Sequence, residues 1–232
     1  MEWVRALIAR HFDIGTGELS VSGVTVGELA RRFGTPLFVY DRAVLDDQLS
    51  LLREALSAAF DVYYSVKANP NPWIVRHFIS RGCGLEVASG GEFRQAVRAG
   101  CPPARILFAG PGKTEHELDL VLAEGIGEIH VESPTEIDRI ASIGRRRGVR
   151  ANIAIRVNPT EEVQGGALRM GGKPLPFGID EEDLDNAVER VLASPFLVLA
   201  GVHLFAGTQI LDCAVLARQY AKGLQVARRV AS

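Results

Sequence analysis

Short runs of apolar residues alternate with amphipathic segments along most of the chain. The apolar runs are rich in β-branched side chains and are only four to eight residues long, which predicts buried strands. The segments between them carry apolar residues on one helical face, and several open with a Ser or Thr followed three residues later by Glu, a helix-capping signal. Six strands are expected in this way, at residues 61–65, 84–87, 106–109, 128–131, 150–157 and 197–204.

Helices are expected after each of these strands, and the first five strands recur at roughly 22-residue spacing, the size of one strand–helix unit. Alternating strands and helices predict an α/β protein with a parallel sheet. A doubly wound sheet and a (βα)₈ barrel both fit this pattern. A closed barrel needs eight strands and usually about 250 residues, so a barrel with six units would be incomplete. The last helical pattern has no Gly or Pro stop signal, which favours truncation.

The N-terminal segment does not follow the repeat. Residues 12–24 predict a small hairpin with a turn at Thr16-Gly17, and residues 26–33 a short amphipathic helix. Residues 38–41 predict a strand that leads into a helix at 42–59. We therefore expect two parts. Residues 1–35 would pack on a domain that the chain lacks, and residues 36–232 would form a partial barrel.

Composition excludes several classes of protein. With 232 residues, 47% of them hydrophobic, and a net charge of −2, the chain is typical of a globular enzyme and not of a nucleic-acid or anionic-membrane binder. Three cysteines without a C-x-x-C pair argue against a disulfide framework or a zinc site, and the histidines lack ligand spacing, so no metal is expected. No apolar run reaches the roughly 18 residues of a membrane span, and no signal peptide is visible, which predicts a cytoplasmic location.

The chemically most informative position is Lys67, which closes an apolar strand at the edge where barrel enzymes carry their reacting groups. A desolvated lysine has a lowered pKa, which favours the neutral amine that attacks an aldehyde. From position alone, however, a lysine that emerges into solvent at a strand end is the better explanation. Gly112-Lys113-Thr114 is not a P-loop, because Leu107 stands where that motif needs glycine.

Five motifs, one at each of five strand ends, change this interpretation. The motifs are Y-S-V-K-A-N at 64–69, L-E-V-A-S-G-G-E at 85–92, F-A-G-P-G-K at 108–113, I-R-V-N-P at 155–159 and G-V-H-L-F-A-G-T-Q at 201–209. They resemble, in order, the motifs of the fold-type III pyridoxal-phosphate decarboxylases, which are the diaminopimelate, ornithine and arginine decarboxylases of the alanine-racemase-like barrel. The resemblance covers nearly the whole chain.

The resemblance implies pyridoxal 5′-phosphate as cofactor and a role for each motif. Lys67 would form the Schiff base, Glu86 would lie near the lysine-bound side of the cofactor, and Arg156 would lie close to its phenolic oxygen. These three are the expected catalytic residues, although Glu86 taken alone also fits a strand-end carboxylate paired with an arginine. The expected cofactor-binding residues are Lys67, Ala68, Arg156, His203, Phe205, Gly207 and Thr208.

The sixth-strand motif departs from the family at one position. Phe205 stands where the family has the histidine that stacks on the pyridine ring; a phenyl ring can stack there but cannot donate a hydrogen bond. His203 lies two residues earlier on the same strand face, and it fits either a cofactor contact or a core histidine. Thr208, in place of the usual serine, would bind the phosphate together with the Gly207 N–H.

The implied reaction is α-decarboxylation of an amino acid. The H-L-F-A-G-T-Q motif and the segment Met170 to Gly178 look most like two subgroups, one associated with exosortase gene clusters and one that decarboxylates carrier-protein-bound glutamate. The substrate would be an amino acid as a small molecule, free or carrier-bound, and the full-length enzyme a homodimer. The family's later phosphate loop, its partner for the pyridine nitrogen and its C-terminal β-domain are not found, so the chain alone is expected to be inactive. The alternatives are a non-catalytic cofactor-binding barrel protein, a racemase or an inactive fragment.

Overall fold

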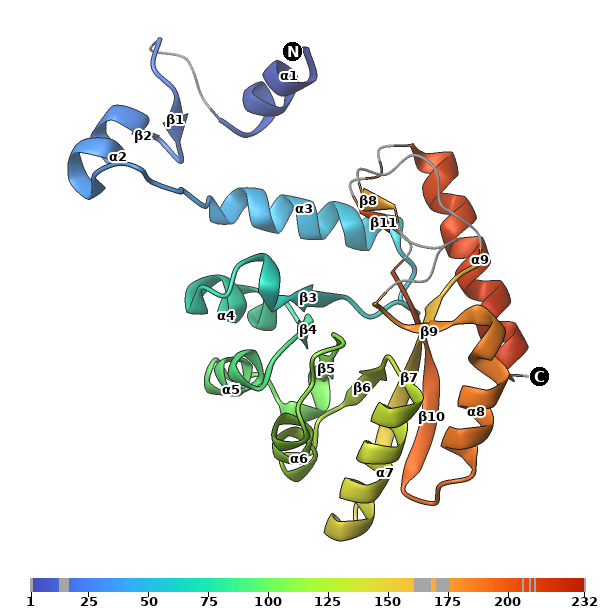
Figure 1. Cartoon of the computed structure of the whole chain (residues 1–232). Helices are drawn as coiled ribbons and strands as arrows, with labels where there is room; N and C mark the ends of the chain where they lie inside the picture. The colour runs from blue at the N-terminus through green and yellow to red at the C-terminus, as the bar shows by residue number, and fades with distance from the viewer. Residues whose placement is uncertain are drawn as a thin grey trace. The chain divides into compact units, whose positions relative to one another are not determined.

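The structure, a computed structural model, describes residues 2–12, 17–160, 168–169, 176–205, 207–208, 210 and 212–231. Figure 1 labels its helices and strands. Residue contacts divide the chain into two compact units, Met1–Asp61 and Val62–Ser232, and each is described by itself.

The first unit contains a hairpin between helices. It consists of α1 (Glu2–His11), β1 (Ser20–Val21), β2 (Val24–Thr25), α2 (Val26–Phe33) and α3 (Arg42–Ala55). The strands β1 and β2 are antiparallel, and the turn between them is formed by Ser22 at φ 49° and Gly23 at φ 79°. Two positive φ values in a two-residue turn are the requirement of a type I′ hairpin, whose twist matches that of its strands.

Several N-terminal expectations need correction. The described hairpin has its turn at Ser22-Gly23. The turn expected at Thr16-Gly17 involves residues 13–16, which lie outside the described residues. The helix α1 was not predicted, while α2 has the predicted bounds. The strand expected at 38–41 is wrong, since these residues have no strand partner in the described structure. Asp41 instead caps α3 by accepting a hydrogen bond from the Ala43 N–H.

The second unit is built on one parallel sheet, in the strand order β10-β7-β6-β5-β4-β3, with the short β9 paired to the end of β7. The six main strands are those expected from the apolar runs, and three of them have the expected bounds. The strands are β3 (Tyr63–Ser65), β4 (Gly84–Val87), β5 (Ile106–Phe108), β6 (Glu128–Val131), β7 (Ala151–Asn158), β9 (Ile179–Asp180) and β10 (Leu197–Leu204). A separate antiparallel pair is formed by β8 (Leu168–Arg169) and β11 (Gly207–Thr208).

A helix follows each main strand, as the sequence predicts (Figure 1). Three short 3₁₀ turns, η1, η2 and η3, span Val66–Ala68, Pro103–Arg105 and Glu181–Asp183. The α-helices are α4 (Pro72–Ser80), α5 (Gly90–Arg98), α6 (Glu115–Ala123), α7 (Pro134–Arg147), α8 (Leu184–Leu192) and α9 (Cys213–Ala231).

The predicted capping signals are present, with one refinement. Ser89, Thr114 and Ser133 each accept a hydrogen bond from the backbone N–H three residues on. Only Thr114 forms the reciprocal capping box. At the other two helices the glutamate reaches one residue further back, Glu92 to the Ala88 N–H and Glu136 to the Glu132 N–H.

The core lies between the sheet and the helices. Alternate strand residues, such as Leu85 and Val87 of β4, are buried against the helices. The residues between them point to the opposite face of the sheet. In the second unit the helices pack on the face of the sheet that carries the core, which is the arrangement expected of a (βα) barrel. The largest fully buried side chains are Phe93, Phe108, Leu85, Ile106, Leu118, Ile129, Ile137, Ile140, Ile143, Ile153, Ile155 and Leu184.

No helix within the described part of the chain is both long and apolar enough to cross a membrane.

In the turn before β6, the backbone of Gly127 lies close to the backbone of Ala104. Gly127 donates its N–H to Pro103 O, and a Cβ at this position would overlap the carbonyl group of Ala104. We expect Gly127→Ala to lower the free energy of unfolding by about 1–3 kcal/mol, because the Ala104 carbonyl is part of the backbone and cannot move aside as a side chain can. The matched control is Gly112→Ala, where a Cβ meets nothing within 4 Å. Equal losses for the two variants in urea denaturation would contradict this packing.

Candidate active site

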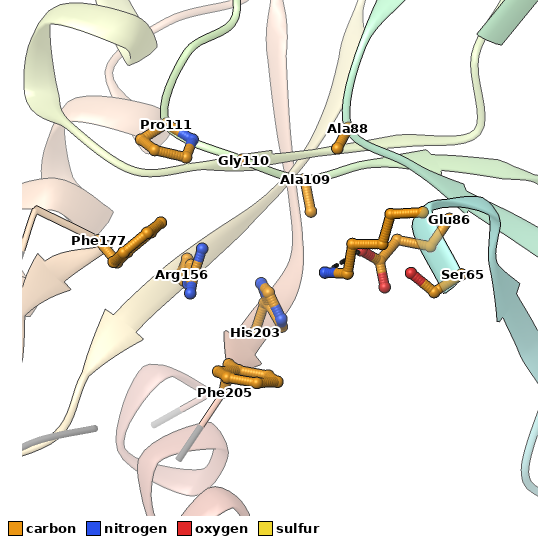
Figure 2. Close-up of a pocket in the computed structure, with 11 residues that line it drawn as sticks. Ser65, Glu86, Ala88, Ala109, Gly110, Pro111, Arg156, Phe177, His203 and Phe205 are labelled. Atoms are coloured by element: carbon orange, nitrogen blue, oxygen red, sulfur yellow. Dashed lines mark hydrogen bonds and ion pairs between the residues drawn. The ribbon is translucent and has the colours of Figure 1, made fainter. Parts of the chain in front are cut away.

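A cavity of about 450 Å³ lies at the C-terminal ends of the parallel strands (Figure 2). This volume is within the range of about 300–1,000 Å³ typical of small-molecule and cofactor sites. Its walls come from the ends of β3, β4, β5, β7 and β10 and from the residues before β9. The lining residues are Ser65, Lys67, Glu86, Ala88, Ala109, Gly110, Pro111, Arg156, Phe177, His203 and Phe205.

Lys67 enters the cavity from η1, the 3₁₀ turn that follows β3. Its Nζ lies 3.5 Å from Glu86 Oε1. Ser65, which pairs with Glu86 across the sheet, lies beside Glu86 (Figure 2). The desolvation expected for Lys67 is not seen, since its side chain is 61% exposed. The reason is its place in the sheet: β3 is the last strand in the described order, so no further strand covers this side. Glu86 pairs with a lysine here, and not with an arginine.

Arg156 is buried at the far side of the cavity, near the end of β7. Its Nη1 donates to Glu132 Oε1 at 2.8 Å. The guanidinium also lies over the ring of Phe177, 4.9 Å from its centroid, and 6.0 Å from that of Phe205. A planar cation held by one carboxylate and two aromatic faces has a restricted orientation.

His203 faces the cavity from β10 (Figure 2), and its ring also packs on that of His130, with centroids 4.4 Å apart. His203 therefore both lines the cavity and packs against a buried histidine. Burial, together with electrostatic interactions with His130, Arg156 and Lys67, lowers the pKa of His203 to about 3. The imidazole is therefore neutral at ordinary pH. Its Nδ1 is buried and has no hydrogen-bond partner within the described residues.

Five of the expected site residues are brought together in this cavity, and three are not. Lys67, Glu86, Arg156, His203 and Phe205 all line it. The remaining three are not among the described lining residues. Ala68 follows Lys67 in η1, and Gly207 and Thr208 form β11, which pairs with β8. Residues 170–175 of the Met170–Gly178 segment, and Ala206 and Gln209, lie outside the described residues.

Sequence reasoning assigned no role to three residues that matter here. Phe177 lines the cavity under Arg156, and Ser65 supplies a buried hydroxyl without a partner among the described residues. Glu132 holds Arg156 from behind. It directly follows the strand at 128–131, the same strand-end signal that pointed to Lys67, so it could have been found.

Comparison with known proteins identifies the class to which this arrangement belongs. Residues 42–232 match the family described as pyridoxal-dependent decarboxylase, pyridoxal binding domain, and the chain belongs to that family. The family consists of enzymes whose cofactor is pyridoxal phosphate. This confirms the resemblance, the cofactor and the enzyme class expected from the sequence.

Two individual relatives are similar to this chain over most of its length. The chain is 37% identical over 208 residues to the diaminopimelate decarboxylase of Zymomonas mobilis, which covers 88% of this chain and 49% of that protein. It is 35% identical over 194 residues to the L-glutamyl-[BtrI acyl-carrier protein] decarboxylase of Niallia circulans, covering 84% and 45%.

A solved structure confirms the fold. The diaminopimelate decarboxylase of M. jannaschii, in co-complex with L-lysine, has a TM-score of 0.84 at 28% identity, over 92% of this chain and 52% of that chain. The parallel sheet is therefore part of a pyridoxal-phosphate decarboxylase barrel, as expected. The chain spans about half the length of the relatives that it matches.

The cavity residues fit pyridoxal phosphate. A primary amine is present at the mouth to hold an aldehyde, and Phe205 offers an aromatic face to a flat ring. Ser65 Oγ and His203 Nδ1 are buried polar atoms without partners among the described residues, as expected at a site built to contact a polar ligand.

The lowered pKa of His203 gives a pH test. Below pH 6.5, His203 is protonated in the unfolded chain, whereas in the folded chain it stays neutral until about pH 3. Stability should therefore fall as pH drops through this window, by about 2 kcal/mol between pH 7 and pH 5 from this group. The variant His203→Gln lacks this proton, so its unfolding free energy should fall less over the same interval. Urea denaturation at both pH values measures the difference, and an identical pH dependence in both proteins would contradict the assignment.

Proposed function

We propose that this chain is the cofactor-binding part of a pyridoxal-phosphate-dependent amino-acid α-decarboxylase, with Lys67 as the covalent attachment point. The observation that carries the proposal is the accessible Lys67 amine, 3.5 Å from Glu86, in a cavity at the C-terminal edge of the sheet. Bound there, the cofactor supplies an acceptor for the electron pair left when carbon dioxide departs.

The side chains around the amine have separate tasks in this proposal. Glu86 holds the Lys67 ammonium by a charge-assisted contact and can take a proton from Nζ, which frees the amine to act as a nucleophile. Lys67 Nζ would also be the group that returns a proton to the substrate carbon. The 61% exposure of its side chain leaves room for the amine to move.

The residues of the far wall would orient the ring of the cofactor. Phe205 presents its face, and the Arg156 guanidinium, fixed by Glu132, lies beside it as a positive charge for an oxygen of the cofactor. His203 is neutral, so it can donate or accept a hydrogen bond without adding a second charge. The phosphate-binding roles of Gly207 and Thr208, and a role for Ala68, stay predictions.

The substrate is proposed to be an amino acid, free as for the diaminopimelate decarboxylases or carrier-bound as for the Niallia circulans relative. We also propose a cytoplasmic homodimer for the full-length protein, in which residues 1–35 pack on a β-domain.

The attachment point can be tested directly. Lys67→Arg keeps the positive charge beside Glu86 but has no primary amine. We expect this variant to lose the visible absorbance of lysine-bound cofactor, and to yield no labelled peptide after borohydride reduction. The control Lys222→Arg alters a lysine of α9 that pairs with Glu181, and it should bind as the wild type does. A reduced adduct on Lys113 or Lys222 would refute the assignment.

The reaction can be tested on the full-length gene product. Carbon dioxide release should be measured with diaminopimelate, ornithine, arginine, lysine and glutamate, and with glutamate on an acyl-carrier protein. We expect one of these to be decarboxylated, and the rate to fall by at least about 10³-fold in Lys67→Arg, because the nucleophile is lost. Cofactor binding without turnover would favour a non-catalytic binding protein. Inversion of the α-carbon without gas release would indicate a racemase.

A further inference from the structure

We propose that Glu132 is the positioning residue of this site. It does not line the cavity. Instead it fixes the Arg156 guanidinium and two segments of the cavity wall in the geometry that receives the cofactor. The inference rests on the proposed function in one respect, that Arg156 acts on the cofactor.

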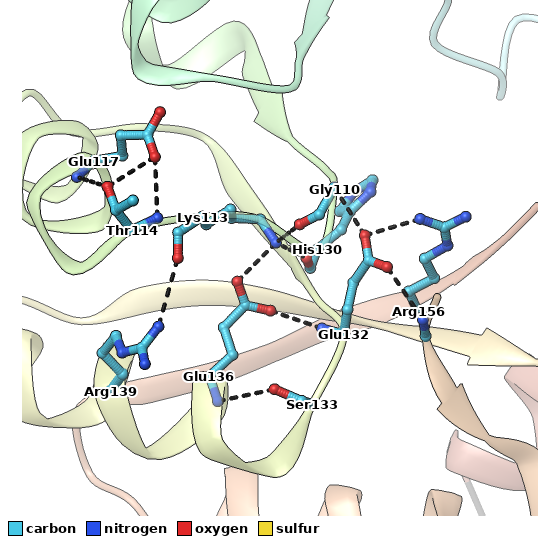
Figure 3. Close-up of polar contacts among 11 residues, drawn as sticks. Gly110, Lys113, Thr114, Glu117, His130, Glu132, Ser133, Glu136, Arg139 and Arg156 are labelled. Carbon is cyan, nitrogen blue, oxygen red and sulfur yellow. Dashed lines mark hydrogen bonds and ion pairs between the residues drawn. The ribbon is translucent and has the colours of Figure 1, made fainter. Parts of the chain in front are cut away.

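The Glu132 carboxylate accepts three hydrogen bonds from three separate parts of the chain (Figure 3). Its Oε1 accepts from Arg156 Nη1 on β7 and from the Gly110 N–H after β5, both at 2.8 Å. Its Oε2 accepts from the Gly178 N–H, just before β9, at 3.1 Å. Arg156, Gly110 and Phe177, the neighbour of Gly178, all line the cavity. One side chain therefore joins three of its walls.

Glu132 is itself held in place from the opposite direction. Its backbone N–H donates to Glu136 Oε2 at 2.8 Å, and Glu136 Oε1 lies 2.8 Å from Lys113 Nζ. Lys113 is completely buried and also donates to the carbonyl groups of Gly110 and His130. Gly110 is thus fixed at both its N–H, by Glu132, and its C=O, by Lys113. Burial raises the pKa of Glu136, while the Lys113 ammonium opposes that rise.

The charges of this group balance in pairs. Two buried cations, Arg156 and Lys113, face two buried carboxylates, Glu132 and Glu136. A buried charge without its partner is costly, so each pair must form together. Because Glu132 neutralises Arg156 without lining the cavity, the remaining guanidinium N–H groups can be directed at the cavity. Glu86, the carboxylate among the described lining residues, pairs with Lys67 instead.

A purely structural role would have a different signature. If Glu132 only stabilised the barrel, its loss would lower stability and would weaken cofactor binding equally with or without Arg156. If it acts through Arg156, the two residues are coupled, and most of the effect on binding disappears once the guanidinium is gone.

The test is a double-mutant cycle on cofactor affinity. The proteins are the wild type, Glu132→Gln, Arg156→Met and the double variant, each titrated with pyridoxal 5′-phosphate. The circular dichroism of the bound cofactor serves as a second readout, because it reports the orientation of the ring. The matched control is Glu115→Gln, which breaks an exposed Glu–Arg ion pair with Arg146, also at 2.8 Å.

We expect Glu132→Gln to weaken cofactor binding by about tenfold or more and Arg156→Met by a similar factor, since each loses a charge-assisted contact. The double variant should bind within about twofold of Arg156→Met. Glu132→Asp, which keeps the charge, should recover part of the affinity, and Glu115→Gln should bind as the wild type does. Unchanged affinity in Glu132→Gln, or equal weakening in both backgrounds, would overturn the proposal.

A measurement without cofactor separates this inference from the proposed function. An ordered guanidinium gives a slowly exchanging arginine Nε–H signal in nuclear magnetic resonance spectra. The Arg156 signal should be present in the wild type and in Glu115→Gln, and lost in Glu132→Gln, or broadened in Glu132→Asp if the first variant does not fold. A wild type that shows this signal but binds no cofactor would refute the proposed function alone. An Arg156 signal that is indifferent to Glu132 would refute the inference.

Discussion

The period-two alternation of side chains along the parallel strands governs this structure. In β4, Leu85 and Val87 are buried against the helices, while Glu86 between them points to the cavity side. The same division holds in β7, where Ile155 and Val157 belong to the core and Arg156 to the site. A shift of one residue in β4 or β7 would place a charge in the core and an aliphatic side chain in the site. Fold and chemistry are therefore specified together.

Much of the second unit could be predicted because its signals are local. Apolar runs and capping residues depend on neighbours within four positions, so the six strands and the helix starts at Ser89, Thr114 and Ser133 were found. The strand-end rule also located Lys67, whereas Glu86 and Arg156 were identified through the resemblance to the decarboxylase motifs. The error at residues 38–41 also follows from the use of local signals. A strand needs a pairing partner elsewhere in the chain, and a local pattern does not show whether one exists.

The contacts that could not be predicted join residues far apart in the sequence. The contact of Glu132 with Gly178 joins residues 46 positions apart, and that of Phe177 with Arg156 crosses a segment with no clear periodicity. The exposure of Lys67 depends on the place of β3 in the strand order and not on the residues around it. Spacing rules identify which residues are placed at a strand end, but partners and burial are set by the fold.

The glutamates at the helix starts also connect neighbouring strand–helix repeats of the second unit. Glu117 completes the capping box of α6 with Oε2, while its Oε1 accepts from the Gly90 N–H at the start of α5, at 2.7 Å. Glu136 similarly accepts a hydrogen bond from the Glu132 N–H and another from Lys113 Nζ, which belongs to the preceding strand–helix repeat. Helix starts and cavity walls are thus parts of one polar layer along this edge of the sheet.

The contrast between Lys67 and Lys113 has a consequence for the selectivity of any aldehyde that enters this edge of the barrel. Both are lysines in loops after parallel strands, and their side chains have the same intrinsic chemistry. Lys113 has all three ammonium hydrogens engaged, by Gly110 O, His130 O and Glu136, and no solvent access. Lys67 has one contact at 3.5 Å and an open approach. An electrophile therefore meets one reactive amine and one that is chemically silent, and the packing around each lysine, more than its identity, decides which is modified.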